Sequence, residues 1–225
     1  MDVIYVMELF PTAIAGLAAG VAGGAIAVAF ARALLAQREL TFYLKKSQIA
    51  LFVVCCAAFG CVIALRTDTW LQVAYSCLMM IGAGTLVITD ILHRRIPNEI
   101  VLALIVIKLA FGIPALLGVE GLPAFNIADS CIGLLVCLII FSLPAAMKKS
   151  VGAGDVKLAA AVGFCLGLQG SLFAVALMGA FVLAYVCFQR QLPIMQMIKE
   201  MVPMGPFLGT AMLVVLVAGP LPTLL

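Results

Sequence analysis

The sequence predicts an all-α polytopic membrane protein with about eight transmembrane helices. Of its 225 residues, 66% are hydrophobic and only 10% are charged, whereas soluble domains are roughly half apolar and about one-quarter charged. The mean hydropathy is +1.28, and apolar stretches close to the roughly 20 residues needed to cross a bilayer recur along the whole length. No polar segment is long enough for a separate soluble domain, so we expect residues 1–225 to form a single membrane-embedded domain.

The first predicted helix covers residues 9–35. The residues before it contain neither Lys nor Arg, so this apolar segment lacks the basic region of a cleaved signal peptide and is expected to remain as a membrane span. Within it, Gly16, Gly20 and Gly24 lie four residues apart, a spacing that lets a neighbouring helix approach closely. We therefore expect this face to pack against another helix.

Seven further helices are expected wherever an apolar run is bounded by polar, glycine or proline residues. They cover residues 47–65, 70–90, 97–118, 127–147, 155–168, 170–189 and 204–223. Pro97 suits the first position of its helix, where its missing N–H is not needed. The sixth helix is short, and its Gly163 and Gly167 repeat the four-residue glycine spacing, so we expect it to pack closely as well.

Basic residues gather in alternate loops, which predicts the orientation of the chain. They follow the first, third, fifth and seventh helices: Arg32, Arg38, Lys45, Lys46, Arg94, Arg95, Lys148, Lys149, Lys157, Arg190 and Lys199. The positive-inside rule places these loops in the cytoplasm and both termini outside. Arg66 lies on the other side, and Lys108 falls near the middle of the fourth helix, where a cation must snorkel, face a polar interior or pair with an acid.

The cysteines give no reason to expect a metal or another cofactor. All eight lie within apolar segments, without a CxxC pair and with His93 as the only histidine, so unpaired thiols that act as small hydrophobes are expected. The chain also lacks a phosphate-binding GxxxxGK and a GxSxG nucleophile elbow. The net charge of +3 comes from short loops, so we expect no nucleic-acid partner.

Two acidic residues lie beside glycine or proline features at the predicted cytoplasmic edge of the membrane. Asp90 ends the third helix in "LVITDILHRRIPNEI", and Asp155 opens the sixth in "KKSVGAGDVKLAAA". Each has a structural explanation when taken alone. Asp155 would cap its helix after Gly152 and Gly154, and Asp90 would meet water at the end of its span.

As a pair, the two carboxylates predict a site for peptide hydrolysis. Two carboxylates within reach of one water can hydrolyse a peptide bond, because one accepts the proton of the attacking water while the other protonates the carbonyl oxygen or the leaving amine. Charges this close share one proton. Glycines beside one aspartate would let an extended substrate backbone come near. The alternative from another class is a small transporter in which Asp90, Asp155 and Lys108 line a polar path.

Three sequence blocks occur in a fixed order along the chain: "DILHRRIPN" (90–98), "GAGDVKLAAAVGFCLG" (152–167) and "PMGPFLG" (203–209). Together they resemble the motifs of the type IV prepilin peptidases, the GxGD aspartic proteases of bacterial inner membranes. In the third block Met204 stands where that family usually has Phe. The first span, "GLAAGVAGGAIAVAFAR", is also similar to that of the family, with Ala27 at a position where Asn is common.

One departure from the family pattern concerns a second activity. Bifunctional members carry a cytoplasmic domain after the first span, often with a cysteine tetrad that binds zinc, which is associated with N-methylation. Here the connection is the short "AQRELTFYLKKS", without cysteine. The resemblance is therefore to the short, peptidase-only members that serve Tad-type pili or secretion systems, and it gives no support to N-methyltransferase activity.

The resemblance implies a peptidase that removes leader peptides from prepilins or pseudopilins at the cytoplasmic face of the inner membrane, for pilus assembly or protein secretion. By motif position, Asp90 and Asp155 would be the catalytic pair, with no metal or cofactor. The site would be shaped by Gly152, Gly154, Lys157, Pro97, Asn98, Pro203, Gly205 and Pro206. A further alternative is an inactive partner in a pilus machine, which would tolerate loss of either aspartate.

Overall fold

The computed structural model describes residues 3–67, 69–146, 152–188 and 204–218, and this part of the chain consists of helices joined by loops. The helices are α1 (Val3–Gln37), α2 (Lys46–Arg66), α3 (Trp70–His93), α4 (Asn98–Leu116), α5 (Ile127–Ala146), α6 (Ala153–Phe188) and α8 (Met204–Ala218). Six of them are long and apolar enough to cross a membrane. The described residues therefore confirm a multi-pass, all-α membrane protein.

The first five helices lie where the apolar runs predicted them, with ends that differ by a few residues. The largest difference is at the start of α1, which begins at Val3 rather than at residue 9. Helix α3 continues to His93, so Asp90 does not end it as expected. The predicted ends of the last two helices, at residues 189 and 219–223, lie outside the described residues.

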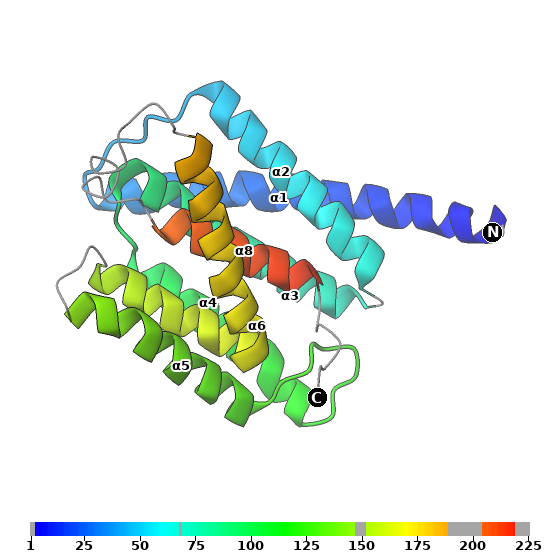
Figure 1. Cartoon of the computed structure of the whole chain (residues 1–225). Coiled ribbons are helices and arrows are strands. Elements are labelled where there is room, and N and C mark those ends of the chain that lie inside the picture. Colours follow the sequence, from blue (N-terminus) through cyan, green and yellow to red (C-terminus); the bar gives the residue numbers. More distant parts are fainter. Residues whose placement is uncertain (1–2, 68, 147–151, 189–203, 219–225) are drawn as a thin grey trace.

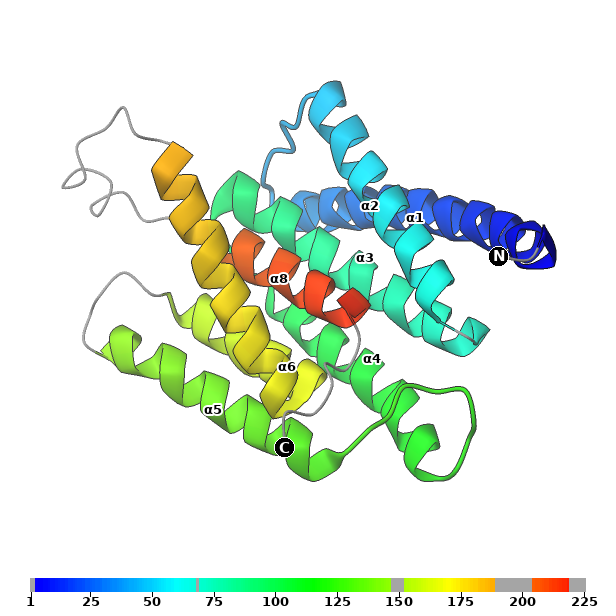
Figure 2. The ribbon, with the colours of Figure 1, turned by 45° about the vertical axis from the view of Figure 1, so that its right-hand side comes forward.

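The predicted separation into two helices at 155–168 and 170–189 agrees with a break in the structure, which lies two residues earlier than expected. The structure has one element, α6, whose backbone turns at Gly167 with φ 72° and ψ −176°, and Figures 1 and 2 show the chain changing direction there. This φ is in the region that glycine adopts without steric cost. The described part thus contains seven helical elements, one of which, α6, joins two helices at this kink.

Glycines on α1 allow α2 to pack against it at short range, as the spacing predicted. A Cβ atom built on Gly16 would lie 2.6 Å from the carbonyl oxygen of Gly60, and one on Gly24 would lie 2.9 Å from Cys56 Cβ. Gly163 on α6 has the same relation to Gly133 on α5. Small residues thus set the spacing of both helix pairs.

The largest hydrophobic cluster joins α3, α4, α6 and α8, with further members from α1 and α5. Its fully buried members include Met79, Leu86, Leu104, Leu158 and Met212. This packing brings the C-terminal end of α3 to the same side of the molecule as the starts of α6 and α8 (left in Figure 2). The candidate site lies at this end of the bundle.

Candidate active site

Asp90 lies on α3, one turn before its last residue, and its side chain is buried. Only 4% of the residue is exposed, which contradicts the expectation that this acid meets water at the end of a span. Its Oδ2 atom has no hydrogen-bond partner among the described residues. Helix α3 ends just beyond it because Arg94 adopts a left-handed conformation, φ 51°, and donates its N–H to the Asp90 carbonyl oxygen at 2.8 Å. A buried carboxylate oxygen without a partner is costly, and such groups concentrate at functional sites.

Gly205, in the first turn of α8, packs directly on the Asp90 carboxyl group. A Cβ atom built on Gly205 would lie 2.5 Å from Asp90 Oδ2 and 2.9 Å from its Cγ, and the Gly205 backbone amide faces the same group. Any side chain at position 205 would therefore displace the carboxyl group. Pro206 follows in α8 and is buried, whereas Pro203 lies outside the described residues.

Asp155 lies in the first turn of α6 and is partly buried. Its Oδ2 accepts a hydrogen bond from the Gly152 N–H at 3.2 Å, and its own N–H donates to the Gly152 carbonyl oxygen at 3.0 Å. This reciprocal pair caps the helix, as in one half of a capping box. The capping role expected from the sequence is therefore real, and it fixes the carboxylate at the start of α6.

The structure brings the two acids into electrostatic range of each other. The charge of Asp155 acts on Asp90, although the two residues belong to different helices. The α3–α4 turn makes this possible by packing on the start of α6, where a Cβ built on Gly154 would lie 3.3 Å from Ile96 Cβ. In addition, Lys157 Nζ donates to Asn98 Oδ1 at 3.3 Å, which ties α6 to the start of α4 beside the buried Pro97.

The short connection between α1 and α2 holds the same turn from the other side. Arg38 forms an ion pair with Glu99, in which Nη2 donates to both carboxylate oxygens, at 3.0 and 2.8 Å. His93 Nε2 lies 2.8 Å from the Thr41 carbonyl oxygen, and the Tyr43 hydroxyl donates to the Leu92 carbonyl oxygen. The sequence pattern did not identify these contacts, nor that of Ile96, because only the folded chain brings the partners together.

The arrangement supplies two carboxylates. Asp90 is buried with Gly205 packed on it, and Asp155 caps the start of α6 with glycines beside it. Among the described residues there is no group of three His, Cys, Asp or Glu side chains that could hold a metal ion. The chemistry that these residues themselves can perform is acid–base catalysis by the carboxylate pair.

Comparison with known proteins gives one match. The model of the type IV leader peptidase family matches residues 77–187, a range that contains Asp90, Asp155 and the glycines beside Asp155, but not Gly205. The searches of curated proteins and of solved structures gave no match.

Proposed function

Because the chain belongs to the type IV leader peptidase family, we propose that it is an aspartic endopeptidase that uses Asp90 and Asp155 to cleave the leader peptides of prepilins or pseudopilins. The observation that carries the proposal is the meeting of these two acids, from α3 and α6, at one end of the bundle. The buried, unpartnered oxygen of Asp90 supports it further.

The mechanism follows from two carboxyl groups that share one proton. The ionised carboxylate accepts a proton from a water molecule, whose oxygen forms a bond to the scissile carbonyl carbon, while the protonated carboxyl group donates its proton to the carbonyl oxygen. The tetrahedral intermediate then collapses: the carboxyl group that took the water proton donates it to the leaving amine, the C–N bond breaks, and the other carboxylate takes a proton from a hydroxyl of the intermediate. The pair thus holds one proton throughout and ends as it began.

The glycines beside Asp155 leave room for a peptide backbone to approach the pair. Gly152 is exposed and Gly154 is partly exposed, so an extended substrate can come close to Asp155 without meeting a side chain. Gly205 sets the position of Asp90 from the opposite side. Asn98 and Lys157 fix the distance between α4 and α6, and therefore hold the site in shape.

The substrate proposal rests on charge and hydropathy. Leader peptides of prepilins are basic and precede a long apolar helix, and cleavage occurs just after a glycine. A membrane-embedded enzyme with acids at its cytoplasmic edge suits such a chain, because the apolar helix can stay in the bilayer while the leader reaches the site. The predicted orientation of the bacterial inner-membrane protein, with both termini outside, belongs to this proposal.

The transporter alternative requires Asp90, Asp155 and Lys108 to line one path. Lys108 instead lines a cavity whose walls include neither aspartate. The peptidase proposal therefore explains more of the arrangement than the transporter does.

The test is co-expression with a prepilin from the same cell, followed by gel analysis of the pilin. We expect the wild type to shorten the pilin, and Asp90→Asn and Asp155→Asn to leave it at full length while accumulating in the membrane. Glu120→Gln is the control, since Glu120 is an exposed acid in the α4–α5 loop, and it should cleave like the wild type. If either Asp90→Asn or Asp155→Asn still cleaves, the catalytic pair is refuted. If the wild type itself leaves the pilin at full length, an inactive assembly partner becomes the better account.

A further inference from the structure

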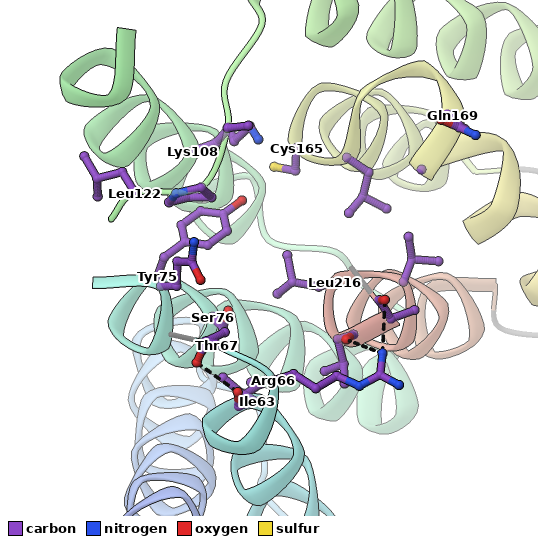
Figure 3. A pocket seen from close by; sticks show the side chains of 18 of the residues that line it. Ile63, Arg66, Thr67, Tyr75, Ser76, Lys108, Leu122, Cys165, Gln169 and Leu216 are labelled. Atoms are coloured by element: carbon purple, nitrogen blue, oxygen red, sulfur yellow. Dashed lines mark hydrogen bonds between the residues drawn. The ribbon is translucent and has the colours of Figure 1, made fainter. Parts of the chain in front are cut away.

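A cavity of about 820 Å³ lies at the end of the bundle opposite the two aspartates. Tyr75 and Ser76, near the start of α3, line it, and 15 residues of helix, or about 22 Å at 1.5 Å per residue, separate Tyr75 from Asp90. The remaining walls come from the ends of α2 and α8, from α4, from the α4–α5 loop and the start of α5, and from α6 around its turn (Figure 3). This cavity is therefore separate from the candidate active site.

Lys108 is a buried cation on the wall of this cavity. The residue is only 9% exposed, and its Nζ lies 5.9 Å from the ring centroid of Tyr75 and 5.3 Å from that of Phe125. Asp129 acts on it electrostatically. However, the one ion pair within the described ranges is Arg38–Glu99, so no described carboxylate reaches Lys108 directly. A cation at this depth in a membrane protein requires a nearby anion or polar partner.

A second group on the same wall also lacks a partner. Tyr75 is only 3% exposed, and its buried hydroxyl makes no hydrogen bond to any residue that the structure describes. Buried hydroxyl groups are nearly always hydrogen-bonded, so an orphaned one indicates an unseen acceptor. Figure 3 shows Tyr75 and Lys108 side by side on this wall.

The charges around the cavity favour an anion. Arg66 and Lys108 are the basic residues of the lining and Asp129 is the acidic one, so the lining carries a formal charge of 2 − 1 = +1. Asp129 is already engaged, since its Oδ1 accepts the Leu168 N–H at 3.2 Å. Arg66 donates through Nη1 to the carbonyl oxygens of Val217 and Ala218 at the end of α8. A ligand with a single negative charge would neutralise this set.

Besides polar members such as Gln72, Ser76 and Gln169, the rest of the lining includes the apolar side chains of Leu166, Phe173, Val215 and Leu216. A free inorganic anion would leave these walls without a partner, whereas an amphiphile would cover them with its hydrocarbon part. The chain is a membrane protein, so phospholipid is the amphiphile that surrounds it.

We propose that this cavity binds the headgroup of an anionic phospholipid, with Lys108 as the counter-charge of the phosphodiester and the Tyr75 hydroxyl as a hydrogen-bond donor to it. The lipid would join α3, α4, α5 and α8 at the end of the bundle remote from the aspartates. The site does not depend on the peptidase function.

The test is native mass spectrometry of the full chain in detergent, stripped of lipid and mixed with phosphatidylglycerol or phosphatidylcholine. We expect one phosphatidylglycerol to be retained under conditions that remove phosphatidylcholine. Lys108→Met should lower the affinity for phosphatidylglycerol by roughly tenfold or more, because a charge-assisted contact is lost. Lys46→Met makes the same change at an exposed lysine at the start of α2 and should leave that affinity unchanged.

Three results would overturn the proposal: equal binding of the two lipids, unchanged affinity in a folded Lys108→Met, or Lys108-dependent binding of inorganic phosphate without binding of lipid. The last result would assign the site to a free phosphate ion. Tyr75→Phe keeps the ring and removes only the hydroxyl, so it tests the site even if Lys108→Met does not fold. We expect Tyr75→Phe to weaken phosphatidylglycerol binding several-fold. Unchanged binding would contradict the proposal that the Tyr75 hydroxyl donates to the phosphodiester.

Discussion

At the scale of single residues, the contact between Gly205 and Asp90 is the most demanding feature of the candidate site. The start of α8 can approach the carboxyl group this closely only because position 205 has no side chain. The glycine thus determines where the Asp90 carboxyl group lies, although it performs no chemistry itself.

Gly205→Ala should therefore reduce cleavage by tenfold or more while the protein still folds. The added Cβ would lie 2.5 Å from Asp90 Oδ2, and catalytic groups lose much of their effect when displaced by about 1 Å. The measurement is the rate of pilin shortening, with thermal unfolding in detergent as a check of folding. In Gly209→Ala, one turn along α8, the added Cβ would have its nearest contact with Val87 Cγ2 at 3.1 Å, the end of a side chain, and none of its three nearest atoms belongs to Asp90. This variant should stay active. Equal activity of the two variants would refute the positioning role.

The sequence identified the two aspartates because each stands in a motif with an unusual neighbourhood of glycine or proline. It also identified Gly205 from the third block, without any indication of what the glycine touches. The contacts of Ile96 and of the Arg38–Glu99 pair could not be predicted from the sequence, because an apolar residue in a turn and a charge in a loop are ordinary features. Such partners are decided by packing over long sequence distances.

At the scale of elements, the turn in α6 is fixed by Gly167 and by a side chain from α5. Gly167 has φ 72°, and the Asp129 carboxylate occupies the space where a Cβ atom would stand. Asp129 also accepts the Leu168 N–H, which the turn leaves without a helical partner. The two halves of α6 thus depend on α5 for their relative direction.

Gly167→Ala should lower the free energy of unfolding by at least about 1–2 kcal/mol, the cost of a left-handed conformation for a residue with a side chain. The clash with Asp129 adds to this loss. Gly179→Ala is the control within the same element, because a Cβ there meets nothing within 4 Å, and it should be neutral or slightly stabilising. The two variants can be compared by denaturant unfolding in mixed micelles. A Gly167→Ala protein as stable as the wild type would contradict this account.

Helix positions could be read from the sequence because long apolar runs and their breaks follow from the thickness of the bilayer. The division of residues 155–189 into two helices agrees with the structure, but the break was expected two residues too late. The chain reverses at a single glycine, supported by an acid from another helix. That support is invisible in the local pattern.

At the scale of the whole molecule, the two proposed sites lie at opposite ends of the bundle of described helices. The aspartate pair lies where α3 ends and where α6 and α8 begin, and the lipid cavity lies where α3 begins and α8 ends. Composition alone predicted a membrane protein and a single domain. It could not predict which helix ends converge, because that depends on how the helices pack.

The charge pattern predicts that the end with the aspartates faces the cytoplasm. In a cysteine-free background, Gln37→Cys and Glu120→Cys would place thiols at exposed positions, the first at the end of α1 and the second in the α4–α5 loop. A membrane-impermeant maleimide should label Glu120→Cys from outside intact spheroplasts, and Gln37→Cys only after permeabilisation. The reverse labelling would contradict the orientation and the access of a cytosolic leader peptide.

The most direct test of the central claim is whether Asp90 and Asp155 act as one catalytic unit. Purified, reconstituted protein would be given a prepilin substrate, and single-turnover cleavage rates would be compared for the wild type, Asp90→Asn, Asp155→Asn and the double variant. Each single variant should lose roughly 10²–10⁴-fold in rate, typical of a lost acid or base, and the double variant should be no slower than the slower single. A single variant that retains wild-type cleavage, or losses that multiply in the double variant, would show that the two carboxylates do not share one reaction.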